Sequence, residues 1–289
     1  MGRLAVENLL LIVACTCIVF LRLRPAPHSK GIGLSDSMAT EWHTACFLIT
    51  GFLLTLVFFD DTPIILTHEG HTVKLLGLRR WYVLATQGYT VLLLYLALSV
   101  AIDCGLESTR MQRTAAQFLA VSHTTSIFSA VSAKFVLIPA YNHVGKWAKL
   151  GFGGRPRPLY LYNSGLLITT GELTLTGRSL NLQHLPAVLL FAAWFCACHL
   201  KLLKEQKVCI YTPLDYSKPL GLLAHVCAFV MFALLFSLGP LTSFFSDAAP
   251  LGRPWTHLVI LVGTLLLIPL REPKKAEAAQ KTEKIDKSD

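Results

Sequence analysis

The sequence predicts an all-α protein, a polytopic transmembrane helical bundle with seven or eight spans. Long apolar runs recur along its 289 residues, and short basic loops separate them. Charged residues make up only 15% of the chain, against about 25% in a soluble domain. A helix of about 20 apolar residues, rising about 1.5 Å per residue, crosses a hydrocarbon layer about 30 Å thick. Lipid is therefore the solvent against which the polar residues are interpreted.

Seven apolar runs are expected to form membrane helices. They are Leu4–Leu21, Thr44–Phe59, Trp81–Ile102, Ala115–Tyr141, Leu185–Leu200, Pro219–Leu238 and Trp255–Leu270. The first run exceeds the hydrophobic region of a signal peptide and ends in arginines, so it is expected to be retained. Arg79 and Arg80 precede Trp81, and this basic pair beside an indole marks a membrane boundary.

The segment Leu159–Thr176 is less apolar and carries Glu172. It lies within residues 142–184, which interrupt the series of runs. Its glycines, threonines and acid predict the least regular apolar segment, packed against protein more than lipid. Counting it as a span places most Lys and Arg on one side of the membrane, as the positive-inside rule requires, with both termini in the cytosol or its equivalent.

Residues 1–270 thus form one expected transmembrane domain, and the charged residues 271–289 form a tail without apolar periodicity. The net charge of +9 comes from Lys and Arg scattered between the runs, without the basic face and stacking aromatics that nucleic-acid binding needs. The expected partners are membrane lipids, with a lipid ester substrate or other membrane subunits as alternatives, and no nucleic acid. The expected location is an endomembrane or the mitochondrial inner membrane.

No metal or cofactor is expected. The eight cysteines form no C-x-x-C pair and lie mostly in or beside apolar runs, which is typical of small buried hydrophobic residues. The stretch His68-Glu-Gly-His71 has two residues between its histidines, whereas the zincin motif has three and so places both on one helix face. This stretch is expected to be a polar loop.

Polar side chains inside spans are the first candidates for chemistry. His123 lies in the fourth run and Thr50 in the second. Spans separated by one helix run in the same direction, so the two side chains are expected at similar depth. A hydroxyl beside an imidazole is a nucleophile beside a base, because the ring takes the hydroxyl proton during attack on a carbonyl. The alternative is structural, with the threonine bonded to its own helix.

An ordered set of short motifs resembles a known family. Trp42 opens the second helix, Leu78-Arg-Arg-Trp81 opens the third, His123-Thr-Thr125 lies in the fourth, and Ile210-Tyr-Thr-Pro213 precedes the sixth. In these motifs the chain resembles the androgen-induced-gene and androgen-dependent tissue-factor-pathway-inhibitor-regulating proteins. The resemblance implies a multi-spanning hydrolase that cleaves fatty acid esters of hydroxy fatty acids with a membrane Thr and His.

The resemblance assigns the base to His123, whereas Cys46 occupies the position of the family's nucleophilic Thr, four residues after Trp42. Thr44 and Thr50 flank that position. If the chain is a hydrolase, His123 is expected to face an apolar cavity, with Thr50, Thr44 or Cys46 within hydrogen-bond reach of its ring.

The missing Thr supports the alternative, a non-catalytic accessory or structural subunit of a larger membrane complex with the same fold. A transporter is a third reading. It would need paired charges near the midplane, for which Lys134 and Glu172 qualify.

Overall fold

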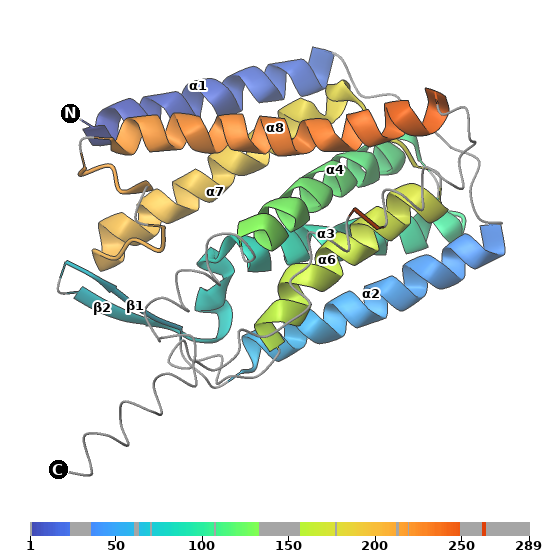
Figure 1. Cartoon of the computed structure of the whole chain (residues 1–289), viewed down its shortest axis with the longest axis horizontal. Helices are drawn as coiled ribbons and strands as arrows, with labels where there is room; N and C mark the ends of the chain where they lie inside the picture. Colours follow the sequence, from blue (N-terminus) through green and yellow to red (C-terminus); the bar gives the residue numbers. More distant parts are fainter. Residues whose placement is uncertain are drawn as a thin grey trace, which may run out of the picture.

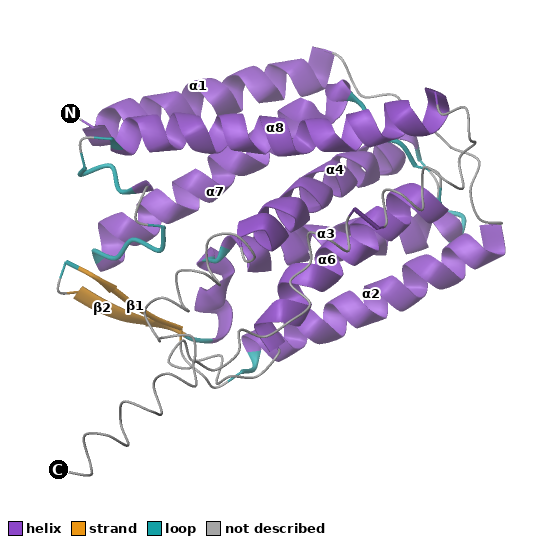
Figure 2. Ribbon diagram, viewed as in Figure 1, coloured by secondary structure: helices purple, strands orange, loops and turns teal. Residues whose placement is uncertain are grey.

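The computed structural model describes residues 2–23, 36–60, 64–69, 71–106, 108–132, 157–176, 178–211, 214–218, 220–248 and 262–263. Helices dominate these residues, which confirms the all-α class (Figure 2). They are α1 (Gly2–Leu23), α2 (Asp36–Phe58), α3 (Leu84–Asp103), α4 (Thr109–Ser132), α6 (Arg157–Leu175), α7 (Leu185–Gln206) and α8 (Gly221–Ala248). Among the described residues, four stretches are long and apolar enough to cross a membrane: Ser37–Phe58, Leu84–Asp103, Leu182–Gln206 and Gly221–Pro240.

The expected apolar runs coincide with helices almost wherever the structure describes them. The start of the third run differs, because Trp81 lies in the 3-10 helix η1 (Gly77–Tyr82) that precedes α3, and Phe59 and Leu220 lie just outside α2 and α8. The fourth run is helical as far as Ser132, and its remainder lies outside the described residues. The same holds for Trp255–Leu270, apart from the helical residues 262–263, and for the tail.

The expectation of an irregular segment at Leu159–Thr176 is wrong. This segment forms the continuous helix α6. Its polar residues do not break the helix, because protein rather than lipid surrounds them: Glu172 is completely buried, and Thr169 and Thr174 bond to carbonyl groups of their own helix.

The expected polar loop between the second and third runs is also wrong, because it contains an antiparallel hairpin of β1 (Ile64–His68) and β2 (His71–Leu75). β-branched residues in both strands favour extended backbone. His68 pairs with His71 at the turn, where Glu69 takes a left-handed conformation with φ of 47°. The hairpin lies beyond the helix ends, near the end of α7 (Figure 1).

Arg80, which the sequence placed at a membrane boundary, is buried within the segment that connects this hairpin to α3. Its Nη1 donates to the carbonyl oxygen of Val57 at 2.7 Å, and its Nη2 donates to that of Asp60 at 2.8 Å. A cation at a helix C-terminus satisfies carbonyl groups that have no partner within the helix. Arg80 therefore caps α2.

The helices form two groups joined by α4 (Figure 1). One contains α1, α7 and α8, and the other contains α2, α3, α4 and α6. Small residues let the second group approach closely, as they do in membrane helix contacts. A Cβ at Gly88 of α3 would lie 2.5 Å from Oγ1 of Thr125 in α4, and one at Gly165 of α6 would lie 2.8 Å from Oγ of Ser126. These glycines bring α4 within hydrogen-bond distance of its neighbours.

Candidate functional site

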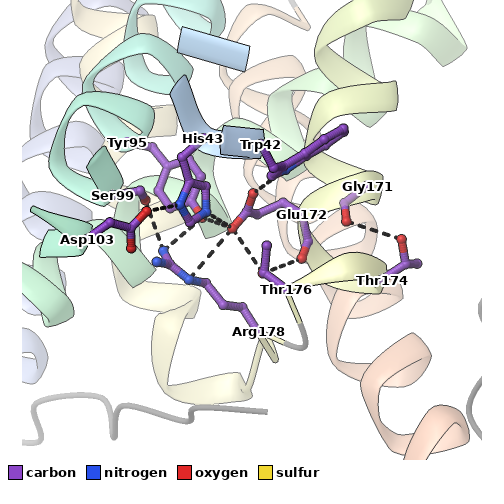
Figure 3. Close-up of polar contacts among 10 residues, drawn as sticks. All are labelled: Trp42, His43, Tyr95, Ser99, Asp103, Gly171, Glu172, Thr174, Thr176 and Arg178. Atoms are coloured by element: carbon purple, nitrogen blue, oxygen red, sulfur yellow. Dashed lines mark hydrogen bonds and ion pairs between the residues drawn. The ribbon is translucent and has the colours of Figure 1, made fainter. Parts of the chain in front are cut away.

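Polar side chains from α2, α3 and α6 converge on the carboxylate of Glu172 (Figure 3). Its Oε2 accepts a hydrogen bond from Nε1 of Trp42 at 2.9 Å. Its Oε1 lies 2.8 Å from Nε2 of His43 and accepts a bond from the Tyr95 hydroxyl. Glu172 is 0% exposed, so these partners replace the water that an ionised carboxylate needs.

His43 bridges two carboxylates. Its Nδ1 lies 2.5 Å from Oδ2 of Asp103, the last residue of α3, while its Nε2 contacts Glu172. An imidazole that donates from both nitrogens carries two protons and a positive charge. The Asp103 side chain is 16% exposed, so the bridge runs from the edge of the protein to its interior.

Arg178, just after α6, supplies the second positive charge. Its Nε lies 3.6 Å from Oε1 of Glu172, and its Nη1 donates to Tyr95 at 2.8 Å and to Ser99 at 3.1 Å. Burial alone would lower the pKa of the guanidinium, but Tyr95, Glu172 and Asp103 raise that pKa above its ordinary value. The guanidinium therefore stays charged.

We call Trp42, His43, Tyr95, Asp103, Glu172 and Arg178 the Glu172 cluster. Two carboxylates face one imidazolium and one guanidinium, so the cluster carries no net charge. In a low-dielectric interior, removing one member leaves an uncompensated charge, which is strongly destabilising. The cluster therefore fastens the end of α6 to α2 and α3.

Gly171 gives Trp42 the space to reach this cluster. A Cβ at Gly171 would lie 2.7 Å from Cζ2 of the indole, which is closer than real contacts permit. The indole thus lies directly on the α6 backbone while its nitrogen bonds to Glu172.

Replacing Gly171 with Ala is expected to lower the free energy of unfolding by up to about 2 kcal/mol. Overpacking costs about 1–3 kcal/mol, which exceeds the roughly 1 kcal/mol that Ala gains over Gly in a helix. Gly51→Ala is the matched control, because its Cβ would meet Leu93 at an ordinary 3.7 Å. Unfolding in detergent, followed by tryptophan fluorescence, measures both; equal stability of the two variants would contradict the close contact.

His123, the base implied by the sequence, lies in α4 opposite α6. Its Nδ1 is 3.1 Å from Oγ1 of Thr169, which is completely buried; His123 itself is 6% exposed. The Thr169 hydroxyl also lies 2.9 Å from the carbonyl oxygen of Gly165. The Thr169 hydroxyl has a single proton to donate. If it donates to the Gly165 carbonyl oxygen, Nδ1 of His123 donates to the hydroxyl oxygen; if it donates to the ring, Nδ1 accepts.

Both sides of this His123–Thr169 pair are structurally defined. Thr169 lies one helical turn before Glu172, so the Glu172 cluster positions the turn that carries it. On the α8 side, a Cβ at Gly239 would lie 3.5 Å from Cδ2 of His123. Pro240 follows, and its missing N–H removes one hydrogen bond from α8 beside the ring.

The three predicted nucleophiles all lie in α2. Thr44 is exposed, Cys46 is a buried free thiol, and Thr50 is buried with no hydrogen-bond partner for Oγ1 among the described residues. Within that same part of the chain, no hydrogen bond joins any of them to His123. Their catalytic role stays a prediction, and the structure brings a different threonine to the ring.

An apolar cavity of about 380 Å³ lies between α1 and the start of α7. Thr16, Cys17, Leu182, Gln183, Leu185, Pro186 and Leu189 line it. His123 is not among the residues that line this cavity, and the expectation that it faces an apolar cavity stays a prediction. The chain connects the cavity to the surroundings of His123. Leu182 lines the cavity, and the nearby Leu180 contacts Gly239, which lies beside His123.

Sequence reasoning missed His43, Tyr95 and Arg178 as partners of Glu172. An acid in an apolar segment requires compensation, and this signal was available from Glu172. Lys134, the partner considered from sequence, lies outside the described residues. The identity of the true partners had no local signal, because they come from three separate segments.

Searches of family models, curated proteins and solved structures find no match to the chain. The class that the structure itself defines is a helical protein compatible with an integral membrane location. Its two distinguishing features are a buried charge-balanced cluster and, one turn away, a buried His–Thr pair.

Proposed function

We propose that the protein is an integral membrane hydrolase of lipid esters, with Thr169 as nucleophile and His123 as base. The observation that carries this proposal is the 3.1 Å distance between His123 Nδ1 and Thr169 Oγ1. A nucleophile within about 2.6–3.2 Å of its base is the geometric signature of covalent catalysis by a hydroxyl group. The sequence resemblance implies the same two residue types.

The reaction requires the His123 tautomer in which the proton is on Nε2. The Thr169 hydroxyl then turns from the Gly165 carbonyl to Nδ1 and attacks the ester carbonyl carbon while Nδ1 takes its proton. As the tetrahedral intermediate collapses, the imidazolium returns this proton to the departing alkoxide, leaving an acyl-threonine. Water activated by the same nitrogen then releases the fatty acid and restores the hydroxyl.

The substrate class is a fatty acid ester of a hydroxy fatty acid, as the resemblance implies. Two apolar chains joined by an ester partition into lipid and approach α4 and α6 from the side. The cavity between α1 and α7, at about 380 Å³, is within the usual range of ligand sites and suits an acyl chain. Entry to the buried pair requires α8 to move, and the Gly239-Pro240 step is the weak point in that helix.

Covalent labelling tests the nucleophile directly. The purified full chain in detergent is treated with a lipophilic fluorophosphonate, and the modified residue is identified by mass spectrometry. An adduct on Thr169, suppressed by the ester substrate, is expected. An adduct on Thr50 or Cys46 with none on Thr169 would refute this assignment in favour of the nucleophiles expected from sequence.

A non-catalytic membrane subunit is the second candidate, and a specific observation favours it. Thr169 bonds to its own helix, as do the neighbouring buried residues Thr124 and Thr125 of α4. That is the structural behaviour of threonine in membrane helices. Absence of both an adduct and ester hydrolysis in the folded protein, together with co-purification in a larger complex, would establish this alternative.

A further inference from the structure

A second polar cluster lies where the hairpin of β1 and β2 meets the connection between α7 and α8. It contains His68 and Glu69 at the hairpin turn, Asp215 in the connection, His199 of α7 and His225 of α8. One ligand atom from each of His68, Glu69 and Asp215 lies within 4.8 Å of the other two. His199 interacts electrostatically with His225, Asp215 and His68, but neither His199 nor His225 joins the group of three in the part of the chain that the structure describes.

His68 and Asp215 approach each other as two ligands of one ion do. Nε2 of His68 is 3.1 Å from Oδ2 of Asp215, yet Oδ2 has no hydrogen bond among the described residues. Tetrahedral zinc, with bonds of about 2.0–2.2 Å to nitrogen and oxygen, separates its ligands by about 3.3 Å. The other oxygen, Oδ1, accepts from the backbone N and the hydroxyl of Ser217, at 2.9 and 2.6 Å, which fixes the carboxylate's orientation.

The two helical histidines each retain a nitrogen without a partner. Nδ1 of His225 donates to the carbonyl oxygen of Gly221 at 2.7 Å, which leaves the lone pair on Nε2. Nε2 of His199 contacts Sγ of Cys209 at 3.1 Å, which leaves Nδ1 unpartnered.

Burial makes these free nitrogens informative. His199 is 2% exposed, and His225 and Asp215 are 0% exposed. Buried polar atoms are nearly always hydrogen-bonded, and a bound ion is one of the few accepted reasons for an exception. Oδ2 of Asp215 is such an atom within the group of three, and the free nitrogens of His199 and His225 lie outside that group.

We propose that the group of His68, Glu69 and Asp215 within this cluster binds a divalent transition-metal ion of the zinc type, with these three residues as ligands and water in the fourth position. Imidazole and carboxylate donors at a mostly buried site suit zinc better than magnesium or calcium, which prefer oxygen ligands alone. The ion joins the hairpin to the α7–α8 connection. The site is separate from the His123–Thr169 pair and does not depend on the proposed hydrolase activity.

The sequence motif that pointed away from zinc is consistent with this site. His68 and His71 are partners across the hairpin turn rather than two histidines on one helix face, and His71 is not in the group of close ligand atoms among the described residues. Instead, His68 contacts Asp215, which lies about 150 residues further along the chain. His71 is exposed, so it serves as the matched control.

Zinc retention by the full chain tests the proposal. Tag-free protein in detergent is stripped with a chelator, equilibrated with Zn²⁺, desalted, and analysed for metal by mass spectrometry. About one Zn²⁺ per chain is expected, and Co²⁺ should give the visible absorption of a tetrahedral site. His68→Ala and Asp215→Asn are expected to weaken binding about tenfold or more, and His71→Ala is expected to leave it unchanged.

Three results would overturn the site. These are no retained metal in the unmodified protein, equal retention by His68→Ala and the unmodified protein, or equal loss in His71→Ala. If His68→Ala does not fold, as judged by circular dichroism, the conservative variant His68→Gln replaces it. His68→Gln is expected to lose Zn²⁺ and the zinc-dependent rise in Tm, and retention of both by the folded variant would overturn the site.

Discussion

Replacing Glu172 with Gln is expected to lower the free energy of unfolding by about 3–5 kcal/mol, as for other buried ion pairs from which one partner is removed. The amide has nearly the same shape, so packing against Trp42 is retained. The loss comes from charge: Arg178 and His43 lose the carboxylate that offsets them inside the protein. Unfolding of the purified protein in mixed detergent micelles measures the effect.

Two further variants separate charge from shape. Glu172→Gln combined with Arg178→Gln removes one charge of each sign, so the double variant is expected to lose much less than the two single losses added together. Glu41→Gln is the matched control, because Glu41 is exposed on α2 just before Trp42. Additive losses in the double variant would show that Arg178 and Glu172 do not act as a pair.

Replacing Thr169 with Val is expected to lower kcat/KM for lipid ester hydrolysis by about 10³-fold or more, the usual loss when a nucleophile is removed. Val keeps the branched shape that fills the contact between α4 and α6, so the fold should persist. Thr169→Ser is expected to retain part of the activity. Fatty acid release from a branched ester measures each variant.

Thr174→Val is the control for this series, since Thr174 lies on the same helix and also bonds to a carbonyl one turn earlier. It is expected to change kcat/KM little. His123→Gln should cause a loss similar to that of Thr169→Val, and the double variant should be no worse than either, because the two residues act as one unit. Full activity in Thr169→Val would remove Thr169 from the mechanism.

The sequence predicted the helices well because its long apolar runs point to lipid as the surrounding solvent. In lipid a backbone has to satisfy its own hydrogen bonds, so a long apolar run has few alternatives to a helix. The hairpin between α2 and α3 lacked this constraint. There the choice between loop and strand depended on pairing of residues such as Ile64 with Leu75, which is a contact between segments and not a property of either one.

His123 could be identified from sequence because an imidazole within an apolar run is costly and therefore usually has a role. Its partner could not be identified in this way. Thr169 lies 46 residues away, on a segment expected to be irregular. Whether it or Thr50 reaches the ring depends on which helix packs against α4, and Gly165 decides this by allowing α6 to approach closely.

The sequence by itself determined the helical class, the positions of the apolar helices and the need of Glu172 for compensation. The tertiary structure alone decided that His43 and Arg178 provide that compensation. It also brought His68 to Asp215 and His123 to Thr169. The physical reason is range: hydrophobic burial acts on whole helix faces and is visible as periodicity, whereas charge pairing and hydrogen bonding require atoms within about 3 Å, a distance set only by helix packing and register.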